Sequence, residues 1–185
     1  MENKILYFSY GANSRKEMME AITGNKNLVG KLAILKGFAL CVQRLDQVPD
    51  AVLSSSPVSL SPKKILEESW SDKFRTYMIK PKENSEVEGM VWELTPQERE
   101  LVRDWELIDL GWYKDMRVKI ITEEGKEIEV ETEGFREGQE VDREVNGRNY
   151  KPFLNRLEDF QRVARKSREE YFARLKMQEG VIPKE

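Results

Sequence analysis

The spacing of apolar residues predicts short strands with helices inserted between them and appended at the end. Apolar runs bounded by turn residues, or apolar and polar residues in alternation, occur in six segments that we predict to be strands: 5–10, 33–42, 74–79, 87–94, 116–121 and 128–132. We expect a turn at 81–84 and a hairpin turn at 123–126. Gly37 predicts a bulge or bend within the second strand.

Two helices are predicted from their start signals. Ser14 and Glu17 have the spacing of a capping box, so a helix is expected to open at Ser14. Thr95 and Glu98 form a second such pair, and Pro96 occupies the first helical position between them. This second helix is expected to run to about residue 105.

The segment 43–72 interrupts the pattern of strands and helices. It is rich in Ser and Pro, and only residues 64–70 could form a short helix. We predict that it elaborates a single domain spanning residues 1–185, as a surface loop in preference to a lid. Apolar residues at helical spacing from 153 to 175 predict a long amphipathic helix, broken near Ser167. The elements together indicate an α+β fold, either a small barrel or a curled sheet.

Charge and composition limit the classes of partner. The 31 basic and 34 acidic residues nearly cancel and are interleaved, so we expect no nucleic-acid partner and no membrane partner. No apolar run reaches membrane-spanning length, and the N-terminal residues lack the pattern of a signal peptide, which favours a cytoplasmic protein. The single Cys41 cannot form an internal disulfide.

The chain contains no histidine, which excludes several kinds of chemistry. Ser-His-Asp and Cys-His catalysis and histidine-ligated metal sites are ruled out, and a metal site made of thiolates alone needs more than one cysteine. The phosphate-binding patterns G-x-x-x-x-G-K-[ST] and G-x-G-x-x-G are absent as well. We expect no metal and no cofactor. Any catalysis must therefore rest on carboxylates, tyrosines and backbone amides.

The end of the first strand is a candidate binding site. The apolar run 5–10 stops at Gly11, and the helix predicted from Ser14 follows at once. Free backbone N–H groups and the positive end of a helix dipole would then converge on one point, which suits a carboxylate or phosphate. An ordinary strand-to-helix turn would have the same residues.

Four short motifs occur in order along the chain. They are Tyr7-Phe8-Ser9-Tyr10-Gly11-Ala12-Asn13-Ser14, Val87-Glu88-Gly89-Met90-Val91-Trp92-Glu93-Leu94, Glu106 with Gly111 and Tyr113, and Lys151-Pro152 with Glu170-Tyr171. In this order they resemble the Tyr-Gly-Ser-Asn loop, the V-x-G-x-V-W-x-L strand, the catalytic glutamate segment and the ending of the gamma-glutamylcyclotransferase family, which includes the AIG2-like proteins. The resemblance covers most of the chain apart from about 43–72.

This resemblance implies a small mixed β-barrel with flanking helices. It also implies an enzyme that cyclises a gamma-glutamyl group of a small-molecule substrate to 5-oxoproline and releases an amine or amino acid, as a monomer or homodimer. Glu106 would be catalytic. The residues that would bind the substrate are Tyr10, Gly11, Ala12, Asn13, Ser14 and Tyr113.

The residues themselves are compatible with this reaction. Nucleophile and electrophile belong to one molecule, so the step needs no covalent nucleophile, metal or activated water. Apolar neighbours of Glu106 are expected to raise its pKa toward neutrality, as a group that is first base and then acid requires. A surface carboxylate is the alternative interpretation of Glu106, and core packing is the alternative for Tyr10 and Tyr113.

Three departures from the family pattern affect the expected substrate. Ala12 stands where serine is usual, Leu154 where some members have tyrosine, and Gln161-Arg162 where a small Gly-Ala pair is found. They leave open a second hypothesis, a non-catalytic small-molecule or partner-binding module on the same fold. A third is a protein-interaction domain that uses the charged C-terminal helix.

Overall fold

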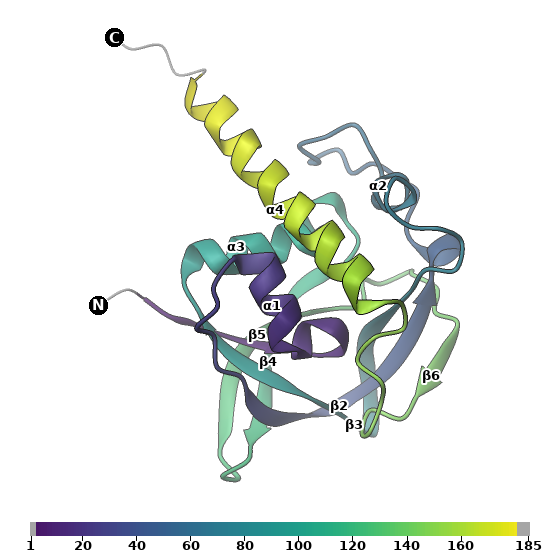
Figure 1. The fold of residues 1–185 in the computed structure, drawn as a ribbon. Coiled ribbons are helices and arrows are strands. Elements are labelled where there is room, and N and C mark those ends of the chain that lie inside the picture. The colour runs from purple at the N-terminus through teal and green to yellow at the C-terminus, as the bar shows by residue number, and fades with distance from the viewer. Residues whose placement is uncertain (1–2, 181–185) are drawn as a thin grey trace.

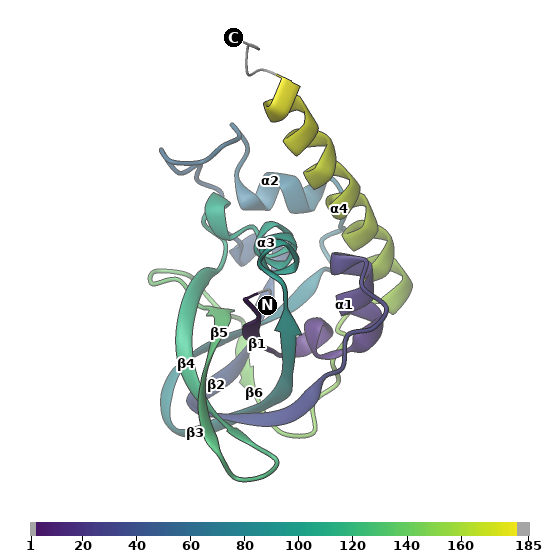
Figure 2. The same ribbon diagram turned by 90° about the vertical axis from the view of Figure 1, so that its left-hand side faces the viewer.

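The computed structural model describes residues 3–180 and shows a β-barrel with helices gathered at one end (Figure 1, Figure 2). The strands are β1 (Ile5–Ser9), β2 (Lys31–Arg44), β3 (Arg75–Leu94), β4 (Lys114–Thr122), β5 (Glu127–Gly134) and β6 (Arg143–Val145). The helices are α1 (Lys16–Thr23), α2 (Pro62–Glu67), α3 (Pro96–Trp105) and α4 (Leu157–Gly180), and three 3-10 turns are η1 (Gly11–Ser14), η2 (Leu45–Gln47) and η3 (Ile108–Leu110).

The barrel closes through five strands in the order β3-β1-β5-β4-β2, because β2 pairs again with β3. The β1–β5 pair is parallel, whereas the other pairs of the barrel are antiparallel, so the barrel is mixed. The short strand β6 adds to the outer part of β2. The predicted small mixed β-barrel with flanking helices is confirmed. No helix within residues 3–180 combines the length and the apolar character that a bilayer span requires.

The turn predicted at 81–84 is wrong, because β3 continues through it as one strand paired with β2. Lys36 pairs with Glu86 and Phe38 pairs with Pro81, so the register shifts at Gly37, which has a φ of +79°. The predicted bulge at Gly37 is confirmed. Residues 82–85 have no partner on β2, and Asn84 among them has a φ of +60°, so the local Pro and Asn signals produce a bulge within one continuous strand in place of a chain reversal.

Two apolar clusters lie on opposite faces of the barrel wall. Inside the barrel, Phe8, Leu35, Leu40 and other buried side chains pack together. Outside it, Tyr7 joins the cluster formed with the apolar faces of α1, α3 and α4. Tyr7 and Phe8 are adjacent in β1 but belong to different clusters, because successive side chains of a strand point to opposite faces. The helices cover the face on which Tyr7 lies.

Several predicted helix boundaries need correction. The helix predicted from Ser14 begins later, at Lys16, with Arg15 as N-cap residue and no side-chain cap, because residues 11–14 form η1 first. The box of Thr95 and Glu98 is confirmed, with both of its hydrogen bonds present. The helix predicted at 64–70 is α2, which begins earlier because Ser61 caps it by accepting from the Lys64 N–H.

Helix α4 is unbroken at Ser167, contrary to the sequence prediction. Its inner half packs against α1 and α3, and Arg168 donates to the Glu20 and Ala21 carbonyls at the C-terminal end of α1. The Glu20 carbonyl also accepts from the N–H of the C-cap residue Gly24 at 2.8 Å, so the guanidinium adds a second donor at the end of α1, where helix carbonyls lack full intrahelical pairing. Packing of α4 on α1 and α3 therefore accounts for its continuity through Ser167. The outer part of α4 projects past the barrel beside α2 (Figure 1, Figure 2).

Close contact between β1 and β3 explains the glycine of the V-x-G-x-V-W-x-L motif. A Cβ atom at Gly89 would lie 2.1 Å from the Ser9 carbonyl oxygen and 2.6 Å from the Phe8 ring. The obstacle is main chain of the neighbouring strand, which cannot rotate away. Only glycine fits at this position of the barrel.

We expect Gly89→Ala to destabilise the protein by about 1–3 kcal/mol or more, because the added methyl group must separate two paired strands. Urea unfolding should show a lower midpoint with an unchanged slope. Gly180→Ala is the matched control, since a Cβ there meets nothing within 4 Å. Equal midpoints for the two variants would contradict the proposed close contact.

Candidate active site

A cavity of about 630 Å³ opens at the helical end of the barrel. Its walls come from the end of β1 with η1, from the segment joining α3 to β4, from residues 57–77, and from α4. The cavity is lined by six of the seven predicted site residues: Tyr10, Gly11, Ala12, Asn13, Glu106 and Tyr113. Ser14 is not among the lining residues. Its hydroxyl donates to the Gly11 carbonyl at 2.7 Å, within the η1 turn.

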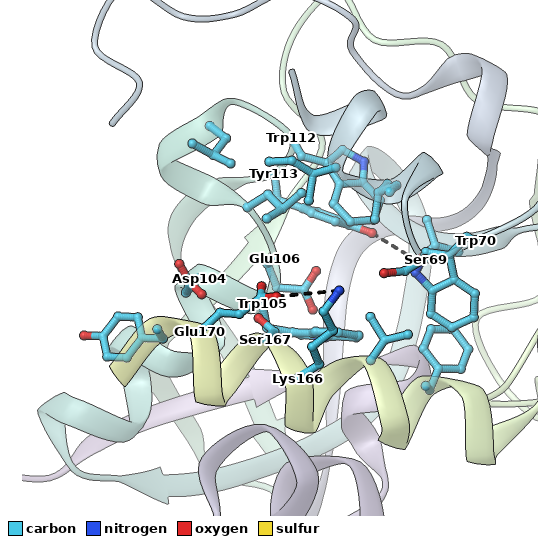
Figure 3. Close-up of a pocket in the computed structure, with 18 of the residues that line it drawn as sticks. Ser69, Trp70, Asp104, Trp105, Glu106, Trp112, Tyr113, Lys166, Ser167 and Glu170 are labelled. Carbon is cyan, nitrogen blue, oxygen red and sulfur yellow. Dashed lines mark hydrogen bonds and ion pairs between the residues drawn. The ribbon is translucent and has the colours of Figure 1, made fainter. Parts of the chain in front are cut away.

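Glu106 is placed in the cavity by the end of α3. It is the C-cap residue of that helix, and its N–H donates to the Val102 carbonyl. Leu107 follows in the left-handed region with a φ of +48°, which turns the chain sharply into η3. A non-glycine residue in this region costs about 1–3 kcal/mol, a strain typical of functional sites. Figure 3 shows the Glu106 carboxylate between Tyr113 and α4.

The Glu-Gly-Tyr spacing of the third motif has a structural explanation. Gly111 ends η3 with a φ of +94°, and a Cβ there would lie 2.8 Å from the side chain of Leu53. Tyr113 is 2% exposed, and its hydroxyl donates to the Tyr77 carbonyl at 2.6 Å. The glycine therefore lets the segment 43–72 approach, and the tyrosine fixes the start of β4 to β3.

The glycine turn is partly occupied by the protein's own groups. Gly11 has a φ of +61°, and its N–H donates to the Tyr150 hydroxyl at 3.2 Å. Tyr150 in turn donates to the Glu88 carbonyl at 2.7 Å. The Gly11 N–H expected to face a ligand is therefore engaged. The next two N–H groups, of Ala12 and Asn13, open a 3-10 turn and have no partner within it.

A chain of hydrogen bonds connects two buried carboxylates. The Asn13 amide donates to Glu106 Oε1 at 2.6 Å and to the Tyr7 hydroxyl at 3.2 Å, and Tyr7 donates to Glu133 Oε1 at 2.6 Å. The Tyr10 hydroxyl donates to the Glu133 main-chain carbonyl at 2.9 Å. Glu133 also lines the cavity. Asn13 therefore fixes the orientation of Glu106 relative to the second carboxylate.

Arg99 supplies the positive charge beside this pair. Its guanidinium, in a side chain only 2% exposed, contacts Asp115 at 2.8 Å, Glu131 at 3.1 Å and Glu133 at 3.8 Å. Its Cζ lies 4.9 Å from the centre of the Tyr7 ring. The Arg99 Nη1 and Glu133 Oε2 atoms that face each other form no hydrogen bond. The guanidinium thus joins α3 to the outer face of β4 and β5.

Burial changes the acidity of both carboxylates. It raises the pKa of Glu106 well above its usual value, and the charge of Glu133 raises it further, whereas Asn13 and Arg99 oppose the shift. Burial also raises the pKa of Glu133 to about 7, against the lowering effects of Arg99 and Tyr7. Near neutral pH the pair can therefore take up or release a proton, which is the property that acid–base catalysis requires.

Sequence reasoning missed Tyr7, Arg99, Glu133 and Tyr150 as parts of the site. The sequence does contain an indication for Arg99. It lies three residues before Val102, so a charged side chain falls on the apolar, buried face of the amphipathic helix α3. Glu133 follows the alternating residues Val130 and Thr132 of β5 and gave no such signal. In the part of the chain that the structure describes, no cluster of three or more Cys, Asp or Glu residues could hold a metal ion.

The segment 43–72, predicted as a surface loop in preference to a lid, contributes to the cavity wall. Pro57, Leu60, Leu66 and Trp70 all line it. The first residue of the segment, Gln43, still belongs to β2 and accepts from the Trp112 indole at 2.9 Å, and the segment packs close to Gly111 through Leu53. It connects β2 to β3 and covers one side of the cavity opposite α4.

Comparison with known proteins identifies the fold. No protein-family model and no curated protein matches the chain. Among solved structures, an uncharacterized human protein is similar with a TM-score of 0.56 and 24% identity, over 76% of this chain and 70% of that one. A gamma-glutamyl cyclotransferase has the same TM-score of 0.56 at 19% identity, over 94% of this chain and 87% of that one. The chain therefore has the gamma-glutamyl cyclotransferase fold, as its four motifs predicted.

Proposed function

We propose that the protein is a gamma-glutamylcyclotransferase-like enzyme, which cyclises a gamma-glutamyl group to 5-oxoproline and releases an amine or amino acid. One observation carries the proposal: the Glu106 carboxylate, buried and with a raised pKa, faces the same cavity as the glycine turn of Gly11 to Asn13. The fold shared with a gamma-glutamyl cyclotransferase supports it. A surface carboxylate would have neither property.

The proposed reaction is an intramolecular aminolysis. The α-amine of the gamma-glutamyl group attacks the side-chain carbonyl carbon, a C–N bond of the five-membered lactam forms, and the C–N bond to the leaving amine breaks. Oxidation states do not change. Glu106 takes a proton from the substrate ammonium before attack and returns it to the leaving nitrogen. The ring nitrogen loses a second proton as the lactam forms, and this proton ends on the released amine, which departs as an ammonium. Since both reacting groups belong to one molecule, orientation in the cavity provides much of the rate enhancement.

The raised pKa of Glu106 suits both halves of this cycle. A substrate ammonium beside the carboxylate favours its charged form, so binding prepares the base. After the proton transfer that positive charge is gone, and burial stabilises the neutral carboxylic acid until the leaving amine accepts the proton. The Asn13 amide holds Oε1 through both steps.

The turn beside Glu106 provides groups of the right kind for the rest of the substrate. The N–H groups of Ala12 and Asn13 are donors for the α-carboxylate, and they do not require the hydroxyl that Ala12 lacks. The Tyr10 hydroxyl already donates to the Glu133 carbonyl, so it can only accept from a ligand. An acceptor at that position suits the substrate ammonium.

We expect Glu106→Gln to lower the turnover of gamma-glutamyl substrates by about 10²- to 10⁴-fold, because an amide cannot carry the proton. Release of 5-oxoproline from a panel of gamma-glutamyl compounds, followed by mass spectrometry, measures the effect. Glutamine retains an oxygen that accepts from Asn13, so thermal stability and ligand affinity should stay close to those of the wild type.

The matched control for this prediction is Glu129→Gln, since the Glu129 side chain is 61% exposed on β5 and does not line the cavity. It should leave turnover unchanged. A folded Glu106→Gln variant with wild-type turnover would refute the catalytic role. Tight binding of gamma-glutamyl compounds by the wild type without any 5-oxoproline would instead favour the non-catalytic binding module.

The pH profile tests the coupling of the two carboxylates. Turnover needs the charged form of Glu106, so kcat/KM should fall as pH decreases through its pKa, at a pH above the ordinary glutamate range of about 4.3. Glu133→Gln removes a negative charge that raises the pKa of Glu106. The acid limb of the profile should therefore move to lower pH in this variant.

Arg99 keeps Asp115 and Glu131 as partners in Glu133→Gln, so the variant should fold, and thermal unfolding checks this. An acid limb that stays in place or moves to higher pH in the folded variant would show that Glu133 does not tune Glu106.

A further inference from the structure

Beyond Glu106 the cavity continues between residues 57–76 and the outer part of α4. We propose that this channel is the site of the leaving group, and that the leaving group is an apolar amine, aromatic or aliphatic, that carries no carboxylate. The inference rests on the proposed function and specifies its substrate class. Its evidence is the size, the lining and the charge of the channel.

The cavity is larger than a gamma-glutamyl group requires. Its volume of about 630 Å³ falls within the range of roughly 300–1,000 Å³ found for drug-sized ligands. The residues that would hold the gamma-glutamyl group, from Tyr10 to Asn13 with Glu106, occupy one end of it. The remaining space is continuous with that end. In cyclisation the leaving amine departs from the carbonyl carbon next to Glu106, so the rest of the cavity is the space available to it.

The lining of the channel is largely apolar and aromatic. Trp70 packs against both Phe74 and Phe160, with ring-centre distances of 4.9 Å each, and the Trp105 ring lies 6.5 Å from that of Phe160. Leu60, 44% exposed, lies at the wall formed by the segment 43–72. Such a surface binds apolar groups by removing them from water. Figure 3 shows Trp70 and Trp105 among the side chains that line the cavity next to α4.

The charges of the cavity wall disfavour a leaving group with a carboxylate. The lining contains three cations, Arg75, Lys166 and Arg174, against six acidic residues: Glu68, Asp104, Glu106, Asp109, Glu133 and Glu170. Two of the three cations, both on α4, already have a carboxylate partner. Lys166 pairs with Glu170 at 3.6 Å and Arg174 pairs with Asp104 at 2.5 Å. Arg75, at the start of β3, donates through Nη1 to the main-chain carbonyls of Asp72 and Phe74 and has no carboxylate within ion-pair distance among the described residues.

An amino acid or peptide as leaving group would bring its own carboxylate into this wall. That group would enter a wall with more acidic than basic residues, and on α4 it would have to displace an existing ion pair to find a cation. Within residues 3–180, Arg75 is the one cation of the lining outside such a pair, and its Nη1 is held by main-chain carbonyls. A neutral apolar amine meets neither obstacle and covers the aromatic surface. A leaving group with a second ammonium could approach the acidic residues, but it would leave the rings of Trp70 and Phe160 uncovered.

The test compares four substrates that differ only in the leaving amine: gamma-glutamyl methylamide, gamma-glutamyl phenethylamide, gamma-glutamylphenylalanine and gamma-glutamyl 5-aminopentylamide. We expect kcat/KM for the phenethylamide to exceed each of the other three by at least about tenfold, the low end of the effect of a well-fitted apolar group. Equal values, or a preference for the carboxylate-bearing or the cationic compound, would overturn the proposal.

Variants locate the effect in the channel. Trp70→Ala should lower the ratio of kcat/KM between the phenethylamide and the methylamide by about tenfold. Leu60→Ser disturbs the fold less and should lower the same ratio by about threefold, since it removes a smaller apolar surface. Val52→Ser is the matched control, because Val52 is 49% exposed in the same segment but does not line the cavity. If the ratio in Leu60→Ser stays at the wild-type value, the wall formed by the segment 43–72 does not bind the leaving group.

Binding separates this inference from the proposed function. Calorimetric titration of the Glu106→Gln variant with the four compounds should give the same order of affinity. If no compound yields 5-oxoproline but the phenethylamide binds most tightly, the reaction is wrong and the channel assignment stands. If 5-oxoproline forms while the methylamide and the phenethylamide bind and react equally, the function stands and the channel assignment is wrong.

Discussion

The contact of one buried guanidinium with three carboxylates organises the functional face of this protein. Arg99 lies on α3, and its partners Asp115, Glu131 and Glu133 lie on β4 and β5. A charge so deeply buried is tolerated only with close partners, because the cost of desolvation is large. Its three contacts therefore fix α3 against the barrel wall. The end of α3, and with it Glu106, is placed by the same contacts.

The buried charges also define the electrostatic character of the cavity. Glu133 is shared between the Arg99 ion pairs and the hydrogen-bond chain through Tyr7 and Asn13 to Glu106. Because one positive charge is distributed over three acids, it compensates the buried pair of carboxylates only in part. Burial therefore raises the pKa of each carboxylate in spite of the opposing effect of Arg99. The side chains that fix α3 on the barrel and the carboxylate proposed to be catalytic are therefore connected by direct contacts.

Much of this arrangement could be predicted from the sequence, and the exceptions have physical causes. The apolar alternation of the strands, the Thr95 capping box and the motif around Glu106 are local patterns. From them the barrel and one side of the cavity could be predicted. The Ser14 start and the 81–84 turn failed, since η1 and the pairing of β3 with β2 override local signals. Arg99 and Glu133 depend on contacts between segments distant in the chain, which no local pattern contains.

The position of the segment 43–72 affects how such a barrel can diversify. Arg44 and Arg75 are paired across β2 and β3, so the two ends of the insertion are held side by side by the barrel itself. The free-energy cost of lengthening a loop between fixed ends grows only slowly with its length. Its residues form one wall of the cavity, while Glu106 and the glycine turn belong to other elements. In the proposed enzyme the residues that react and the wall that selects the leaving group therefore belong to different elements, so this wall could change without altering the reacting residues.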